Sequence, residues 1–166
     1  MEITGEIVNN TDKLATTCYK MMKDMYKKDY SEILNIFYGI NVSEIASLDK
    51  GESLSLRPEP FSVLSLPIPD TRNPTIFDCL DEYCKKETLD GENAWYNEDL
   101  DIHQNVSRGI IFWSLPNILI IDLKRWTSYG RKNQTKVSSQ LSDVDFSNYV
   151  KGYDSKSYIY ELYVIA

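Results

Sequence analysis

Apolar residues recur at helical spacing near the start of the chain and again near its middle. From Thr11 to Asp29 they fall at every third or fourth position, as in an amphipathic helix. The residues of this stripe are Leu14, Cys18, Met21, Met22 and Met25. A second stripe follows Thr75, whose spacing to Asp78 is typical of a helix capping box, and it ends at Asp90. The sequence therefore predicts two helices.

Short apolar runs bounded by glycine or proline predict strands in the rest of the chain. Residues 31–37 indicate a short helix or turn that leads into a strand over 40–45. The stretch 47–60 is polar and contains two prolines, so we expect an irregular connection that feeds a buried strand over 61–66. Three further strands are expected, over 109–113, 117–126 and 158–165, with a hairpin loop at 127–140. The predicted class is α+β, with strands gathered toward the C-terminal half.

Composition adds limits to this outline. The chain has 166 residues, 42% hydrophobic and 26% charged, which suits one domain with one core. No run approaches the roughly 18 apolar residues that a membrane helix requires, and the first residues lack the pattern of a secretory or transit peptide. We therefore expect an intracellular protein, cytoplasmic or nuclear, with no membrane partner. The three cysteines are too few and too scattered for a disulfide framework.

The negative charge of the chain is concentrated in one segment. The formal net charge is -7, and residues 78–101 alone carry nine acidic and two basic side chains. This balance argues against nucleic acid as a partner, because phosphate binding needs clustered lysine and arginine. The acidic segment could steer a basic protein partner. The alternative is a solvated helix face and loop with no partner.

Candidate catalytic residues are few. The only histidine, His103, follows acidic residues in a polar segment, where we expect it to be exposed to solvent. Cys18 lies within the apolar stripe of the first helix, so a buried structural thiol is favoured over a nucleophile. The sequence contains no phosphate-binding glycine loop and no zinc-protease motif.

Five segments in order resemble the ubiquitin-specific proteases, the papain-like cysteine deubiquitinases. They are Ser31-Glu-Ile-Leu-Asn-Ile-Phe-Tyr-Gly39, Glu59-Pro-Phe-Ser-Val-Leu-Ser-Leu-Pro-Ile-Pro69 with Thr75-Ile-Phe-Asp-Cys-Leu80, Glu87-Thr-Leu-Asp-Gly-Glu-Asn-Ala-Trp-Tyr96, Leu115-Pro-Asn-Ile-Leu-Ile-Ile-Asp-Leu-Lys-Arg-Trp126 and Tyr160-Glu-Leu162. The fourth is similar to the family's LPxxLxxxLKRF pattern. The resemblance implies a partial papain-like ubiquitin-specific-protease fold: fingers and a palm with an antiparallel sheet, plus N-terminal helices. Residues 1–30 would supply a helix from the thumb side, and 31–166 the fingers and palm.

The resemblance also implies an activity, with departures that matter. In the complete family, a cysteine thiolate attacks the bond that links ubiquitin to a protein, and a histidine acts as base and then acid. Thr17-Cys18-Tyr19 is similar to part of the family's cysteine box, but it lies too close to Ser31 to leave room for the thumb, and the chain ends where the histidine box would begin. No catalytic residue is therefore assigned.

Ubiquitin, or a ubiquitinated protein, is the partner that the resemblance implies. Trp126, at the aromatic position of the LKRF pattern, is the residue expected to line the channel for the ubiquitin tail; the alternative is that it packs within the palm. Many members hold a zinc ion in the fingers through two cysteine pairs. The matching positions here are Ser47, Lys50, Asn97 and Leu100, so we expect no metal and no cofactor.

Three functions remain open from the sequence. The first is part of a thiol-dependent hydrolase that removes ubiquitin from proteins. The second is a catalytically inactive ubiquitin-binding module. The third reading is a protein-interaction scaffold with no affinity for ubiquitin.

Overall fold

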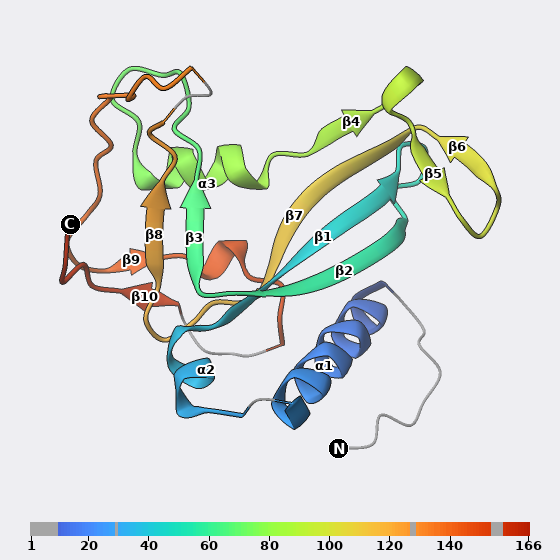
Figure 1. Cartoon of the computed structure of the whole chain (residues 1–166), viewed down its shortest axis with the longest axis horizontal. Helices are drawn as coiled ribbons and strands as arrows, with labels where there is room; N and C mark the ends of the chain where they lie inside the picture. The colour runs from blue at the N-terminus through green and yellow to red at the C-terminus, as the bar shows by residue number, and fades with distance from the viewer. Residues whose placement is uncertain (1–9, 29, 127–128, 154–157) are drawn as a thin grey trace.

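The computed structural model describes residues 10–28, 30–126, 129–153 and 158–166 (Figure 1). The helices are α1 (Asn10–Lys28), α2 (Glu32–Phe37) and α3 (Ile76–Cys84), with single 3-10 turns η1 (Gly91–Asn93) and η2 (Ser147–Tyr149). The strands are β1 (Gly39–Ser47), β2 (Ser53–Phe61), β3 (Val63–Leu66), β4 (Glu87–Leu89), β5 (Trp95–Asn97), β6 (Ile102–Gln104), β7 (Val106–Ser114), β8 (Ile120–Leu123), β9 (Val144–Asp145) and β10 (Ile159–Tyr160). This mixture of helices and mainly antiparallel strands confirms the α+β class.

A four-stranded antiparallel sheet, in the order β2-β1-β7-β4, forms the long projecting part of the molecule. Its three long strands sweep away from α2 toward the β5–β6 hairpin at the far end (Figure 1). Val42 in β1 pairs with Pro58 of β2 on one side and with Ile111 of β7 on the other. The far hairpin is thereby placed at a distance from the two shorter sheets, β3-β8 and β9-β10.

Helix α1 covers one face of this sheet, as its apolar stripe predicted. Leu14 and Cys18 are buried against Ile40, Val42 and Trp113. The ring of Tyr19 also meets that of Trp113 edge to face, with centroids 5.6 Å apart. No helix in the described part of the chain is both long and apolar enough to cross a membrane.

The main core lies on the opposite face, between the sheet, α3 and the β3-β8 pair. Phe112 is fully buried there, next to Leu66 and Cys79, although its neighbour Trp113 packs under α1. Successive residues of a strand point to opposite faces, so β7 joins the two cores. Helix α3 begins with the expected capping box: the hydroxyl of Thr75 accepts from the amide of Asp78 (3.2 Å), and the carboxylate of Asp78 accepts from the amide of Thr75 (2.7 Å).

Three expectations about strands were wrong. The stretch expected to be an irregular connection contains β2, a nine-residue strand. Strands therefore do not gather in the C-terminal half, because β1 and β2 form half of the largest sheet. At the C-terminus only Ile159 and Tyr160 form a strand, and residues 161–166 are irregular and exposed. Strands β3 and β8 pair in parallel, whereas the other strand pairs of the described residues are antiparallel.

Candidate functional site

Trp126 emerges just beyond the only parallel strand pair of the described residues. Strand β3 runs beside β8 with Leu66 opposite Leu123, and the amide of Lys124 continues the pairing by donating to the carbonyl of Leu66 (2.8 Å). Trp126 follows two residues later and is 68% exposed. The side chain therefore does not pack within the core, which removes the structural alternative considered for it from the sequence. Its assignment as a ubiquitin contact stays a prediction.

Arg125 holds the segment that follows Trp126. Its guanidinium Nη1 donates to the carbonyl oxygens of Asn133 (3.2 Å) and Thr135 (2.8 Å). The amide of Asn133 in turn donates to the carbonyl of Arg125 (2.6 Å), and the Asn133 side chain accepts from the amide of Thr135 (2.9 Å). These bonds tie the two ends of the loop together. The sequence motif does not predict this role of Arg125, because the carbonyl groups that accept its hydrogen bonds belong to residues 133 and 135, beyond the motif.

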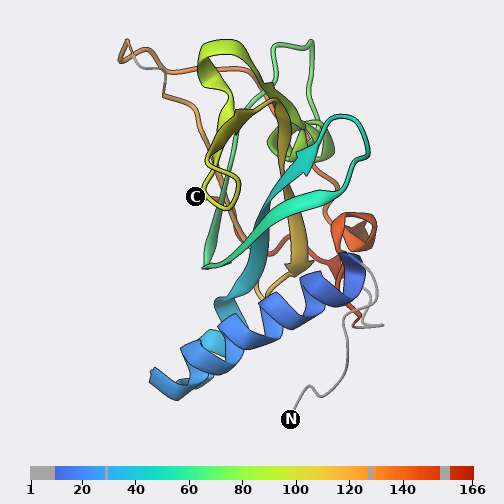
Figure 2. The same cartoon turned by 90° about the vertical axis from the view of Figure 1, so that its right-hand side faces the viewer.

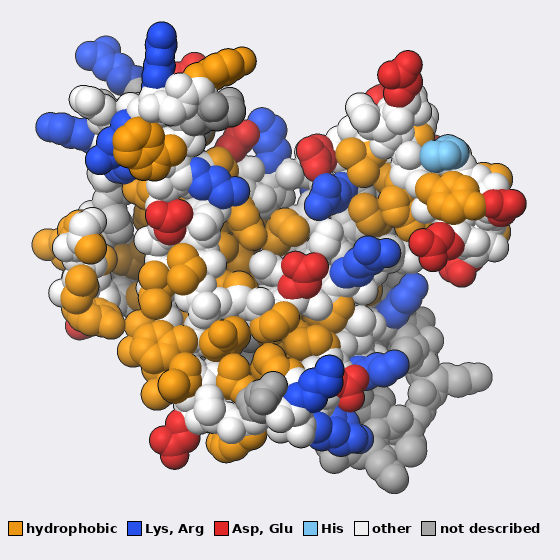
Figure 3. Space-filling view, viewed as in Figure 1, with side chains coloured by type: hydrophobic (Ala, Val, Ile, Leu, Met, Phe, Trp, Pro, Cys, Tyr) orange, Lys and Arg blue, Asp and Glu red, His pale blue; other side chains and the backbone are white. Residues whose placement is uncertain are grey.

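The described residues 124–126 and 129–136, named here the Trp126 loop, form a basic and aromatic surface. The cations are Lys124, Arg125, Arg131, Lys132 and Lys136, and the sequence has no carboxylate between 124 and 136. The ammonium of Lys132 lies 6.0 Å from the centre of the Trp126 ring, within the range of a cation–π contact. Tyr129 is 89% exposed. Figure 3 shows basic side chains gathered at this end of the molecule.

The β5–β6 hairpin, residues 94–104, has the opposite charge. It carries Glu98, Asp99 and Asp101 and contains no lysine or arginine. Its exposed apolar side chains are Tyr96, Leu100 and Ile102. The phenol of Tyr96 donates a hydrogen bond to the carboxylate of Asp101, and this bond raises the pKa of Tyr96 above its ordinary value. The acidic segment found in the sequence is thus partly a projecting hairpin with apolar side chains at its surface.

The basic loop and the acidic hairpin stand at the two upper ends of one face, with a hollow between them (Figure 3). Figures 1 and 2 show the same arrangement in the ribbon: the loop rises beyond β8, and the hairpin curls over from the far end of the sheet. A partner seated in the hollow would contact surfaces of both charges.

The two residues considered for catalysis are not brought together. Cys18 is buried under the sheet, and burial raises the pKa of its thiol to about 12. His103 lies in the far hairpin, where its Nδ1 is 3.2 Å from the carbonyl of Ala94 and its ring meets that of Tyr96. The helix and the hairpin are separated in both ribbon views (Figures 1 and 2). A neutral thiol without a nearby base is a poor nucleophile, as the sequence indicated.

The four positions matched to the family's zinc cysteines lie in two different hairpins. Ser47 and Lys50 flank the β1–β2 turn, where the Ser47 hydroxyl accepts from the amide of Lys50 (3.3 Å). Asn97 is buried, donates to the Gln104 side chain (3.0 Å) and accepts from the amide of Asp99 (3.1 Å). The two hairpins overlap in Figure 1 but are well apart in Figure 2. Within the described residues, no group of three His, Cys, Asp or Glu side chains is placed to hold a metal ion.

Leu48 and Leu100 do not act as an apolar replacement for a zinc staple. The two leucines are 48% and 59% exposed, so they do not form a buried apolar contact that could stand in for the metal. The hydrogen bonds of Asn97 stabilise its hairpin locally, so each hairpin is held by contacts of its own.

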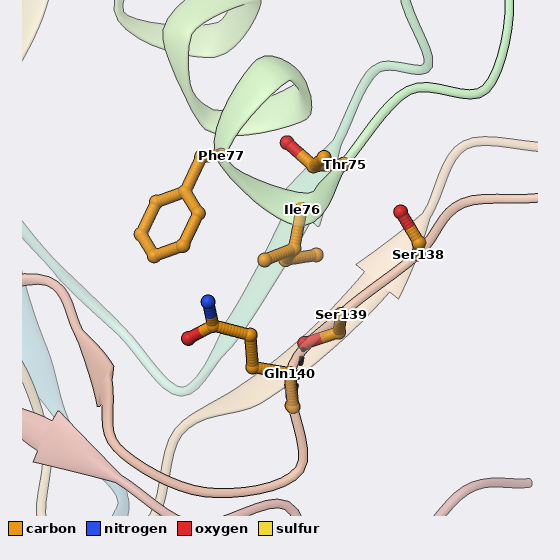
Figure 4. Close-up of a pocket in the computed structure, with 6 residues that line it drawn as sticks. All are labelled: Thr75, Ile76, Phe77, Ser138, Ser139 and Gln140. Atoms are coloured by element: carbon orange, nitrogen blue, oxygen red, sulfur yellow. Dashed lines mark hydrogen bonds between the residues drawn. The ribbon is translucent and has the colours of Figure 1, made fainter.

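A small pocket of about 210 Å³ opens at the start of α3 (Figure 4). It lies between Thr75, Ile76 and Phe77 and the segment 138–140. The amide of Ile76 donates to the carbonyl of Ser138 (2.9 Å), and the capping box uses the amides of Thr75 and Asp78. These donors at the helix start are therefore already engaged within the protein.

The fold resembles that of solved deubiquitinating modules. The SAGA DUB module Ubp8/Sgf11/Sus1/Sgf73 bound to monoubiquitin matches 81% of this chain, over 30% of that chain, with a TM-score of 0.65 and 23% identity. The same module bound to ubiquitin aldehyde matches equally, with a TM-score of 0.65 and 24% identity. The architecture is therefore a partial ubiquitin-specific-protease fold.

The sequence comparisons define the family. A family model described as ubiquitin carboxyl-terminal hydrolase matches residues 6–166, and the chain belongs to this family. A relative named putative ubiquitin carboxyl-terminal hydrolase 11, from Arabidopsis thaliana, is 38% identical over 55% of this chain and 11% of the relative. Ubiquitin carboxyl-terminal hydrolase 4 from Eremothecium gossypii is 37% identical over 66% of this chain and 13% of the relative. The chain thus spans little more than a tenth of these relatives.

Proposed function

We propose that this chain is the fingers and palm portion of a deubiquitinase domain and that it binds ubiquitin in the hollow between the Trp126 loop and the β5–β6 hairpin. The observation that carries the proposal is that the Trp126 side chain is 68% exposed, three residues beyond the end of strand β8. A large aromatic side chain held outside the core is typical of a binding hot spot. The family membership and the neighbours solved with ubiquitin support the choice of partner.

In the complete enzyme, the reaction would be hydrolysis of the bond to ubiquitin by a cysteine thiolate with a histidine as base and acid. Residues 1–166 supply neither group in a working arrangement, because the Cys18 thiol is buried and His103 lies in a separate hairpin. This portion would position ubiquitin, with its tail passing Trp126. The burial of the Cys18 thiol and its separation from His103 also favour a second candidate, a catalytically inactive ubiquitin-binding module.

A titration of residues 1–166 with ubiquitin, followed by NMR, tests the binding. Trp126→Ala should weaken ubiquitin binding at least about tenfold, as expected when a hot-spot aromatic is truncated. Its cost in unfolding free energy should stay within about 0.5 kcal/mol, because the side chain is largely in solvent. Tyr163→Ala, an exposed aromatic at the C-terminus, is the matched control and should leave binding unchanged. Absence of any ubiquitin binding by the wild-type chain would favour the scaffold reading.

A cleavage assay with a fluorogenic ubiquitin substrate tests the catalytic part separately. The isolated chain should be inert, since the only cysteine in the matching motif is a buried thiol. Cleavage that disappears in Cys18→Ser would contradict this expectation and the structural role of α1.

A further inference from the structure

A groove of about 570 Å³ runs between α1 and β2, the edge strand of the four-stranded sheet. Its apolar lining consists of Met21, Met25, Leu56, Pro58 and Pro60. Its charged lining consists of Lys20, Lys28 and Arg57 with the single carboxylate of Asp24. The groove shares no residue with the Trp126 loop or the β5–β6 hairpin. It is a second candidate binding surface, independent of the proposed ubiquitin site.

The charge of the groove is opposite to that of the whole chain. Three cations face one carboxylate here, although the formal net charge of the protein is -7. Helix α1 adds further lysines outside the groove at Lys13, Lys23 and Lys27. A positive field over an apolar lining attracts a partner that carries both carboxylates and apolar side chains.

The edge of β2 limits the shape that such a partner can have. Pro58 and Pro60 pair with Val42 and Ile40 of β1, although proline has no N–H group to donate. The nitrogen atoms of both prolines therefore face the free edge of the sheet and not β1. A strand added at this edge would find no donors at those two positions. The methionines of α1 are flexible and polarisable, and such side chains adapt to the face of a docked helix. These features favour a helix over a strand as the occupant.

We propose that the groove between α1 and β2 is a docking site for an acidic amphipathic helix of a partner protein. Apolar side chains at i, i+3 or i+4 and i+7 of that helix contact Met21, Met25 and Leu56. Lys20 and Lys28 are eight residues apart on α1, which is about 12 Å along the helix axis. Carboxylates two turns apart on the partner helix match this spacing, and Arg57 pairs with a carboxylate from the β2 side.

A labelled synthetic helix tests the proposal on the full chain. The probe is an 18-residue peptide with leucine at i, i+3, i+4 and i+7 repeats and glutamate at most other positions, and binding is followed by fluorescence anisotropy. The double variant Lys20→Glu with Arg57→Glu should weaken binding at least about tenfold, because attraction becomes repulsion at two rim positions. The matched control, Lys23→Glu with Lys27→Glu, makes the same change of charge on α1 outside the groove. It should change the affinity less than about threefold, because exposed charges farther from the ligand are screened by salt.

Several outcomes would overturn the docking site. Equal weakening by the groove variant and its control would show a general charge effect, and equal binding of a glutamine-for-glutamate peptide would show that the cations play no part. Loss of binding in Trp126→Ala would move the site to the other surface. A dimer seen by sedimentation and abolished by the groove variant would make a second copy the occupant. If the double variant has a lower melting midpoint than the wild type, Lys28→Glu replaces it. Lys28→Glu should still weaken peptide binding more than the control variant does.

Discussion

The Trp126 loop and the β5–β6 hairpin stand at two ends of the same hollowed face and both expose large apolar or aromatic side chains, but they differ in charge and in how they are held (Figure 3). The loop has five cations and no carboxylate, whereas the hairpin has three carboxylates and no lysine or arginine. The loop is tied by one guanidinium to two backbone carbonyls. The hairpin is tied by the buried amide of Asn97.

For the proposed ubiquitin site, this difference predicts separate roles for the charged and the apolar side chains. Opposite charges at the two ends of a binding face orient a partner and exclude the reversed orientation, because like charges placed face to face are unfavourable. The exposed aromatic and apolar side chains then supply the contact area. A ubiquitin molecule held here would be oriented chiefly by charge and held chiefly by side chains such as Trp126.

Arg125→Ala should have the largest effect, because one change removes both hydrogen bonds that the guanidinium makes to the returning chain. Each hydrogen bond to a charged donor contributes about 1.5 to 3 kcal/mol, so loss of both bonds should cost about 3 to 6 kcal/mol and open the loop locally. Hydrogen exchange should show lost protection at the amides of Asn133 and Thr135, while β8 keeps its protection. Ubiquitin binding should fall along with loop order, since Trp126 adjoins the anchor.

Arg125→Lys is the matched control for this prediction. A lysine keeps the charge but offers a single ammonium in place of the planar fork, so it should restore part of the protection. Unchanged exchange at residues 133 and 135 in Arg125→Ala would show that the loop does not depend on the guanidinium.

Asn97→Ala should have a smaller effect, confined to the hairpin. It removes the bond to Gln104 and leaves the amide of Asp99 without its acceptor, at a cost of about 1 to 2 kcal/mol. Thermal melts should report this loss, and amide exchange should increase at residues 95–104 but not in the Trp126 loop. Asn105→Ala, at an exposed neighbouring position, should leave the melting midpoint unchanged. A loss spread over both surfaces would show that they are coupled.

Asp101→Asn should change the titration of the hairpin and lower its stability at neutral pH by less than Asn97→Ala does. The bond to Asp101 is the largest cause of the raised pKa of Tyr96, followed by burial and the charge of Glu98. Without the carboxylate charge, the pKa of Tyr96 should fall toward the ordinary tyrosine value of about 10. Glu98→Gln should lower this pKa less. Carbon-13 NMR of the tyrosine rings, assigned with Tyr96→Phe, measures both shifts.

The sign of the related stability effect follows from linkage. Because the folded state raises the pKa of Tyr96, the stabilisation from its hydrogen bond is fully present below the pKa of the unfolded chain, about 10. It is lost as the pH rises through the higher folded value. An alkaline melting series should therefore separate wild type from Asp101→Asn below that range and bring them together above it.

The sequence predicted the elements whose signals are local. The stripe of α1 and the spacing of Thr75 and Asp78 specify helices by side-chain period and capping, and both helices were confirmed. The second was predicted to end at Asp90 but ends at Cys84, because residues 87–89 pair with β7 as strand β4. The strand β2 was missed because its prolines suggested a connection. Its apolar residues nevertheless alternate from Leu54 to Pro60 with polar ones between them, a strand period, and proline is tolerated on an edge strand.

The site was predictable only in part, because its geometry depends on distant pairings. The motif located Trp126, but its exposure depends on the end of the parallel β3-β8 pair. The role of Arg125 requires the chain to return at Asn133, which no local pattern indicates. The contrast of charges was visible as an acidic segment, yet its placement opposite the basic loop depends on the curl of the whole sheet (Figure 1).

Treatment with a chelator should have the smallest effect of all on stability. This result would distinguish the β5–β6 hairpin from fingers that are held by zinc. Ser47 and Asn97 use their side chains in hydrogen bonds, and neither Lys50 nor Leu100 offers a soft ligand to zinc. The melting midpoint should therefore be the same with excess EDTA and with EDTA saturated by calcium, and purified protein should contain less than stoichiometric zinc. Stoichiometric zinc, or a melting midpoint lowered only by the free chelator, would show that the fingers contain a metal site. The hydrogen bonds of Asn97 would then not be what stabilises the hairpin.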